Sequence, residues 1–117
     1  MKTFRYFLPM MVLLICFTAC KKDKSDYQET LSELYKTYSN GEIMECKLDG
    51  KTVFEAGINA YDAGWVIYDQ DGKVIGECNY AWAGVDSICN ELTACETVYR
   101  CRDHISGQAY TDKYGLD

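Results

Sequence analysis

The sequence is poor in proline, in histidine and in positive charge. Among its 117 residues proline occurs once, at Pro9, and histidine once, at His104. Its 12 lysines and arginines stand against 18 aspartates and glutamates, so the formal net charge at pH 7 is −6. An acidic chain of this kind offers no basic face to a phosphate backbone, so nucleic acid is excluded as an expected partner.

Metal-binding spacings are absent as well. No two cysteines have the C-x-x-C spacing of zinc sites, and the single histidine, His104, follows Cys101 by three residues. The stretch Asp69-x-Asp71-Gly72 resembles part of a calcium loop, but its glycine directly follows the second aspartate instead of standing at the sixth loop position. We therefore expect a hairpin turn there, and we expect neither a metal nor a cofactor.

A convergent catalytic set is not visible either. Cys101, Asp103 and His104 supply a thiol, a carboxylate and an imidazole, but they lie in one short stretch. The groups of such catalytic sets normally come together in space from distant parts of a sequence. We therefore expect that the protein is not an enzyme.

The N-terminus has the three parts of a secretory signal. Lys2 and Arg5 supply a short basic segment, an apolar run covers residues 6–19, and small residues precede Cys20. The run contains the single proline and is shorter than the roughly 20 residues that a membrane-spanning helix needs. We therefore expect residues 1–19 to be a signal peptide.

The end of this run, Phe17-Thr18-Ala19-Cys20, resembles the lipobox of bacterial lipoproteins. The resemblance implies that the signal is cut before Cys20 and that Cys20 carries acyl chains, which hold the protein on a membrane. Residues 20–25 then form a short lipidated tether. Because Lys21 is not the aspartate that retains many such lipoproteins at the inner membrane, the resemblance implies the outer membrane, at its periplasmic face or at the cell surface.

Cleavage would leave a chain of one domain with 10 basic and 18 acidic residues, a net charge of −8. Its cysteines besides Cys20 are Cys46, Cys78, Cys89, Cys95 and Cys101. A small exported domain is usually stabilised by disulfides. Any of the five can remain unpaired while the other four pair in three ways, and the residues alone do not choose among these 15 arrangements.

The period of the apolar residues predicts one helix followed by strands. Ser25 and Gln28 have the spacing of a capping box, and apolar residues recur at helical spacing from Tyr27 to Tyr38, before the stop signal Asn40-Gly41. Turn residues then separate the remaining segments. These are strands 42–48 and 51–56 around Asp49-Gly50, strands 65–68 and 73–80 around 69–72, a short helix over 86–95 capped by Asp86, a last strand over 96–102, and a tail over 105–117.

These segments predict one α+β domain over residues 26–104. We expect a small antiparallel sheet of hairpins, with one N-terminal amphipathic helix and one short helix, stapled by disulfides. No internal repeat and no low-complexity segment interrupts this range.

Residues 42–101 resemble small cysteine-containing lipoprotein domains of uncharacterised function from Gram-negative bacteria. The resemblance is carried by Cys46, residues 59–64, Ile67-Tyr68-Asp69 with Gly72, and Cys78. It brings no activity. It implies disulfides drawn from Cys46, Cys78, Cys89 and Cys95, with Cys101 as the odd thiol. If residues 86–95 are helical, a bridge between Cys89 and Cys95 is disfavoured because the two side chains point from different faces.

Four aromatic residues cluster on or just after the second hairpin: Trp65, Tyr68, Tyr80 and Trp82. On a sheet, such side chains can form an exposed surface that stacks on glycans or binds a protein. The alternative is that they are buried and fill a small core. The sequence thus favours a membrane-anchored, non-catalytic binding or accessory module with an envelope protein or glycan partner. The alternatives are a structural envelope lipoprotein and a small enzyme.

Overall fold

The computed structural model describes residues 24–61, 63–79 and 85–117, and these ranges form one antiparallel sheet with one α-helix. The helices are α2 (Gln28–Tyr38) and the short 3-10 helix η3 (Ser87–Asn90). The strands are β1 (Gly41–Leu48), β2 (Lys51–Ile58), β3 (Trp65–Tyr68), β4 (Val74–Cys78), β5 (Thr93–Arg100) and β6 (Thr111–Asp112), in the spatial order β4-β3-β2-β1-β5-β6. The α+β class holds in this coarse form, with more residues in strands than in helices.

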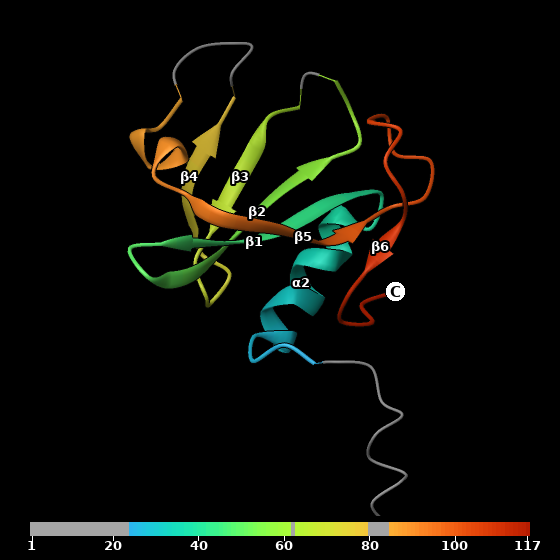
Figure 1. Cartoon of the computed structure of the whole chain (residues 1–117), viewed down its shortest axis with the longest axis horizontal. Helices are drawn as coiled ribbons and strands as arrows, with labels where there is room; N and C mark the ends of the chain where they lie inside the picture. The colour runs from blue at the N-terminus through green and yellow to red at the C-terminus, as the bar shows by residue number, and fades with distance from the viewer. Residues whose placement is uncertain (1–23, 62, 80–84) are drawn as a thin grey trace, which may run out of the picture.

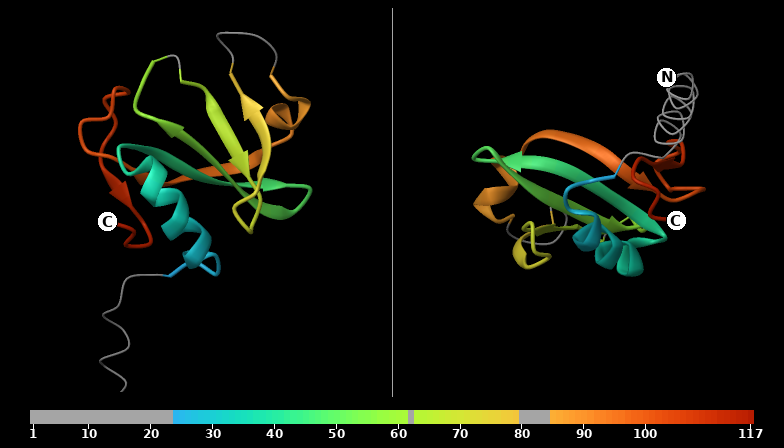
Figure 2. Two further views of the ribbon diagram at one scale, coloured as in Figure 1. Left: turned by 180° about the vertical axis from the view of Figure 1, so that it is seen from behind. Right: turned by 90° about the horizontal axis from the view of Figure 1, so that it is seen from below.

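The sheet is strongly twisted and carries α2 on one face. In Figure 1, β3 and β4 run steeply across the view, whereas β1 and β5 run nearly horizontally. Figure 2 shows α2 lying against the sheet, where it contacts β1 and β2. The N-terminal end of α2 lies at one end of the molecule, and the loops that follow β2 and β5 lie toward the other end (Figure 1).

The two hairpins form where their turn residues allow it. Asp49 and Gly50 have φ values of 51° and 79°, so both central residues of the β1–β2 turn are left-handed, as a two-residue hairpin turn requires. In the β3–β4 turn Gly72 has a φ of 84°, and the Asp69 side chain accepts hydrogen bonds from the backbone N–H groups of Asp71 and Lys73. The Asp69–Gly72 stretch is therefore a hairpin turn, as its sequence predicts.

The larger core lies between α2 and the sheet. Leu31, Leu34 and Tyr38 of the helix are buried against the central strands, where Ile43 and Phe54 are fully buried. Before the helix, the Ser25 hydroxyl accepts the N–H of Tyr27 and the Gln28 side chain accepts the N–H of Ser25, so these two residues satisfy backbone donors reciprocally. A helix near the predicted position thus brings an apolar stripe to the sheet.

A second, smaller core lies on the opposite face of the sheet. Its buried members are Cys46, Val53, Ile67, Cys78 and Cys89. Neighbouring residues along a strand alternate between faces, so Val53 joins this core while Phe54 joins the core under α2. The segment around η3 covers this face, and the Ile88 side chain packs over Gly76 so closely that an added Cβ would lie 2.7 Å from it.

The short helix predicted over residues 86–95 is wrong in extent. Only Ser87–Asn90 is helical, and Cys95 lies in β5, which starts at Thr93. Two constraints override the helical pattern: Thr93 pairs with Lys47 of β1, and Cys95 is bonded to Cys46. The Asp86 side chain also makes no capping hydrogen bond to the short helix. Its carboxylate instead accepts a hydrogen bond from the N–H of Glu77 on the edge strand β4.

The residues that the sequence analysis separates as a tail over 105–117 are part of the packed domain. β6 pairs with the end of β5, and the N–H of Lys113 donates to the carbonyl oxygen of Val98. Tyr110, Tyr114 and Leu116 pack against the core under α2. The sequence pattern is weak here because a two-residue strand leaves too few positions for a visible alternation.

Gly41 has a different role from the stop signal that its sequence suggests. The helix ends at Tyr38, and Gly41 is the first residue of β1, paired with Ile58 of β2. A Cβ added to Gly41 would lie 2.2 Å from the carbonyl oxygen of Gly57. Glycine is therefore needed for the close approach of two strands rather than to end a helix.

We predict that Gly41→Ala lowers the free energy of unfolding by about 1–3 kcal/mol, the usual cost of overpacking, because β1 must move away from β2. Urea unfolding followed by circular dichroism measures this difference. Asn40→Ala is the control, because Asn40 is exposed and its substitution leaves the close contact between Gly41 and Gly57 unchanged. Equal unfolding midpoints for Gly41→Ala and wild type would contradict the prediction.

Candidate functional site

The described chain contains two disulfides. They join Cys46 to Cys95 and Cys78 to Cys89, and Cys101 is a buried free thiol. These are the four cysteines that the family resemblance implies, with Cys101 left over. Burial raises the pKa of the Cys101 thiol, so the thiol is a poor nucleophile.

The four aromatic residues of the predicted binding surface are not brought together. Trp65 and Tyr68 are three residues apart on β3, so their side chains point to opposite faces of the sheet. The Tyr68 hydroxyl bonds that of Tyr38 at 2.7 Å in the core under α2, whereas Trp65 belongs to the opposite core. Tyr80 and Trp82 lie outside the described residues, as does Cys20.

A cleft lies beside Trp65, where the β2–β3 loop faces the loop that follows β5. It has a volume of about 440 Å³ and is lined by Glu42, Ile58, Ala60, Tyr61, Gly64, Trp65, His104, Ile105, Ser106 and Gln108. The hydrogen bond from the Ile105 N–H to the Asn59 side chain joins the two loops. Among the described residues the large exposed apolar side chains are Ile58, Tyr61, Val74 and Ile105, and three of these four line the cleft.

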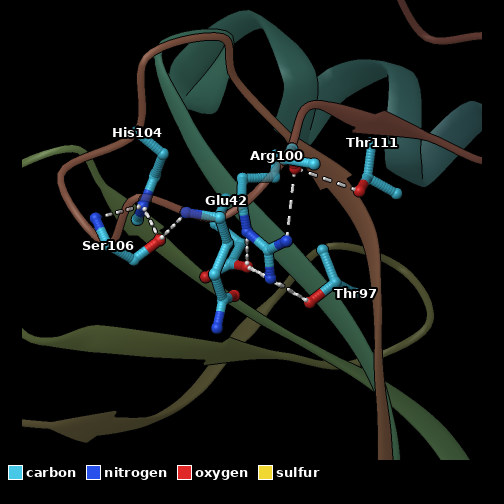
Figure 3. Close-up of polar contacts among 8 residues, drawn as sticks. Glu42, Thr97, Arg100, His104, Ser106 and Thr111 are labelled. Atoms are coloured by element: carbon cyan, nitrogen blue, oxygen red, sulfur yellow. Dashed lines mark hydrogen bonds and ion pairs between the residues drawn. The ribbon is translucent and has the colours of Figure 1, made fainter.

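The charge on the wall of the cleft is neutralised within the protein. The Glu42 carboxylate accepts a hydrogen bond from Arg100 Nε at 2.6 Å and another from the Thr97 hydroxyl at 3.1 Å. Figure 3 shows the Arg100 guanidinium pointing at Glu42, and its Nη1 also donates to the carbonyl oxygen of Ala109. Both side chains of the pair are largely buried, so removing either would leave an uncompensated buried charge. This network therefore fixes the loop position.

His104 makes local contacts rather than catalytic ones. Its Nδ1 lies 2.8 Å from the Ser106 hydroxyl and 3.2 Å from the Ser106 N–H (Figure 3). Cys101 belongs to the core under α2, while Asp103 is exposed with a φ of 55°. No hydrogen bond joins Cys101, Asp103 and His104 within the described part of the chain, so the three groups form no relay there.

One carboxyl group on the face of the smaller core has no hydrogen-bond partner in the described ranges. Glu55 lies in the middle of β2, opposite Met44 of β1 and Ile67 of β3, and is 9% exposed. One carboxylate oxygen and the two sulfur atoms of Cys46 and Cys95 lie within 4.8 Å of one another. Burial, and the nearby charge of Glu42, raise the pKa of Glu55.

This carboxyl group and the two sulfurs form a cluster of potential metal ligands in the described part of the chain. Both of its sulfurs are committed to a disulfide bond, which leaves one carboxylate as a free ligand. A single carboxylate is too few ligands for a zinc or calcium site. In its disulfide form the cluster is therefore not a metal centre.

Comparison of this chain with protein-family models, with curated protein sequences and with solved structures finds no match. Within the residues that the structure describes, no helix has the length and apolar character needed to cross a membrane.

Sequence reasoning missed most of the cleft. The opposite orientation of Trp65 and Tyr68 could have been read from their odd spacing in a strand. By contrast, nothing local marks Glu42, Arg100 or Glu55, because charged residues are common at this composition and only the sheet pairing shows which of them are buried.

We predict that Glu55→Gln stabilises the protein at neutral pH by about 1 kcal/mol, because it removes a charge that is largely withdrawn from water and is repelled by Glu42. The folded-state pKa of Glu55 is raised above 4.5, so the wild type gains stability as the pH falls through that pKa and has the full gain below 4.5. The advantage of the variant is therefore largest at neutral pH and shrinks in acid.

Thermal unfolding of both proteins between pH 4 and pH 8 measures the difference. Glu91→Gln is the control, because Glu91 is exposed and should show no such dependence. A melting-temperature difference between Glu55→Gln and wild type that does not change with pH would contradict the burial argument.

Proposed function

We propose that the protein is a lipid-anchored lipoprotein of the cell envelope whose folded domain is a non-catalytic binding or accessory module. The anchor is Cys20, in the stretch that resembles a lipobox, and the location is the outer membrane. Disulfides fit an exported protein, because they persist in oxidising compartments. Protease digestion of intact cells distinguishes the periplasmic face from the cell surface.

The observation that carries the binding role is the gathering of exposed apolar side chains at the cleft. Ile58, Tyr61 and Ile105 line it, and Tyr61 is 86% exposed. Exposed apolar side chains scattered singly need no explanation, but a group of them around a concave surface is typical of a binding site. Tyrosine suits this role because its ring offers a large apolar area and its hydroxyl a polar edge.

The position and chemistry of the cleft support the same role. The loops that form it lie toward the end of the domain away from the start of α2, where the tether would join (Figure 1). A partner would therefore reach the cleft without meeting the membrane to which Cys20 is attached. Because Glu42 is paired with Arg100, the cleft presents few net charges in an otherwise acidic protein, which favours a protein or glycan partner over an ion.

We predict that Cys20→Ala abolishes membrane attachment, because the variant has no thiol to which the lipid can be bonded. The variant should be soluble or remain unprocessed, as measured by fractionation of cells after a high-salt wash and by gel mobility. Cys16→Ala is the matched control, because Cys16 lies in the apolar run that is removed with the signal. A processed Cys20→Ala protein in the membrane pellet would refute the lipid anchor.

We predict that position 61 contacts the partner. With Tyr61 replaced by the photocrosslinking residue p-benzoylphenylalanine, irradiation of cells should give one discrete adduct, identified by mass spectrometry. The same replacement at Val74, which is exposed on the edge strand β4, should give none. Tyr61→Ala should then weaken binding of the identified partner by about tenfold or more, as for an aromatic hot spot. Equal crosslinking at both positions, or none at position 61, would argue against the cleft.

A further inference from the structure

The two disulfides differ in how a thiol could reach them. Cys78 and Cys89 are both buried in the smaller core, under the segment around η3. The other bond crosses between neighbouring strands, from Cys46 on β1, which is 1% exposed, to Cys95 on β5, which is exposed. Thiol–disulfide exchange requires access to one sulfur and a leaving group at the other. An attacking thiolate can therefore approach the sulfur of Cys95. The sulfur of Cys46 would then be the leaving group, and it would be released as a thiolate in the protein interior.

A thiolate released at Cys46 would be buried and would need a proton. Glu55 is placed to supply it, because its carboxyl oxygen lies within 4.8 Å of the sulfurs of both cysteines. Glu55 is 9% exposed and makes no hydrogen bond in the described part of the chain, where every fully buried side-chain oxygen has a partner, so its carboxyl oxygens keep a narrow contact with solvent. A carboxyl group that is largely withdrawn from water and has no hydrogen-bond partner in the protein is costly to ionise, which favours its protonated form beside this disulfide.

The surroundings of Glu55 favour the protonated acid. On β1 the residue that faces Glu55 is the apolar Met44, and on β3 it is the apolar Ile67. The charge that acts on Glu55 from β1 is that of Glu42, two residues before Met44, and Glu42 is itself paired with Arg100 of β5. No basic side chain among the described residues forms an ion pair with Glu55. Burial and the Glu42 charge both raise its pKa, so a carboxylic acid with a proton to give persists to higher pH than for an exposed glutamate.

We propose that Cys46–Cys95 is a redox-active disulfide that exchanges with a dithiol, and that Glu55 donates the proton to Cys46 on reduction and accepts it on oxidation. This inference does not depend on the cleft or on the lipid anchor. It gives the domain an exchange activity with a dithiol, of the kind that a protein with a pair of reduced cysteines would supply.

The exchange balances in two steps. A thiolate of the dithiol attacks Cys95 Sγ, the Cys46–Cys95 bond breaks with its electron pair on Cys46, and the Glu55 carboxyl proton passes to the Cys46 thiolate. The second thiol of the dithiol loses its proton to solvent, attacks the dithiol sulfur that is bonded to Cys95 and closes the disulfide of the dithiol. Cys95 is released as a thiolate, which solvent protonates. The dithiol loses two electrons, the protein gains two, and Glu55 regains its proton from solvent.

The test uses the full-length lipoprotein in detergent and dithiothreitol as the dithiol. Reduction is stopped with acid at timed intervals between pH 4.5 and pH 8, and free thiols are alkylated and mapped by mass spectrometry. Within each molecule, Cys78–Cys89 serves as the internal control. We expect Cys46 and Cys95 to be alkylated at least tenfold faster than Cys78 and Cys89.

The pH profile tests Glu55 itself. Divided by the thiolate concentration of dithiothreitol, the reduction rate of Cys46–Cys95 should fall by about a hundredfold as the pH rises through the pKa of Glu55, because the proton donor is lost. In Glu55→Gln this fall should disappear, while the exposed control Glu91→Gln should keep it. Protection of Cys78–Cys89 in Glu55→Gln verifies that the variant is folded.

Two results would overturn the proposal. Equal reduction rates for both disulfides would mean that they are reduced only when the whole domain unfolds. An unchanged pH profile in Glu55→Gln would mean that the Cys46 thiolate is protonated by another group. A buried carboxyl group with only a packing role would alter the melting temperature in Glu55→Gln but not the profile of the rate.

Discussion

The pairing of β1 with β5 is the constraint on which the rest of the structure depends. These strands are distant in the sequence, and their association places β1 at the centre of the sheet with β2 on its other side. Cys46–Cys95 links them across 49 residues, and closing a loop of that length stabilises a fold by about 4 kcal/mol in the chain-entropy account. With β5 in place, β6 and the C-terminal residues gain an edge to pair with, and Arg100 comes beside Glu42.

The same pairing explains how the domain handles two buried carboxyl groups differently. Glu42 stands opposite Arg100 and is neutralised by it, so the charge contributes to holding the loops of the cleft. Glu55 stands between Met44 and Ile67, which offer no polar partner, so its charged form is disfavoured. One carboxyl group thus serves the architecture, and the other remains available for proton exchange next to the disulfide.

Local sequence signals predicted the elements whose cause is local. The turn at Asp49-Gly50 needs two left-handed residues, and both have that conformation, so the register of β1 with β2 follows from the turn itself. The strand over 65–68 has the predicted bounds, and the turn before β4 has its glycine at the left-handed position. The helix over residues 28–38 follows from an apolar stripe that only a period of about 3.6 residues brings to one side.

The sequence by itself thus determined the helix and the hairpins. It could not determine which strands are neighbours across the sheet, because pairing between distant segments depends on burial of both faces at once. Only the tertiary structure therefore ended the helix of 86–95 at Asn90, drew Cys95 into β5 and packed residues 105–117 onto the core. It also decided the site: Trp65, His104 and Glu42 come from separate elements, and their proximity arises from long-range packing that no local pattern encodes.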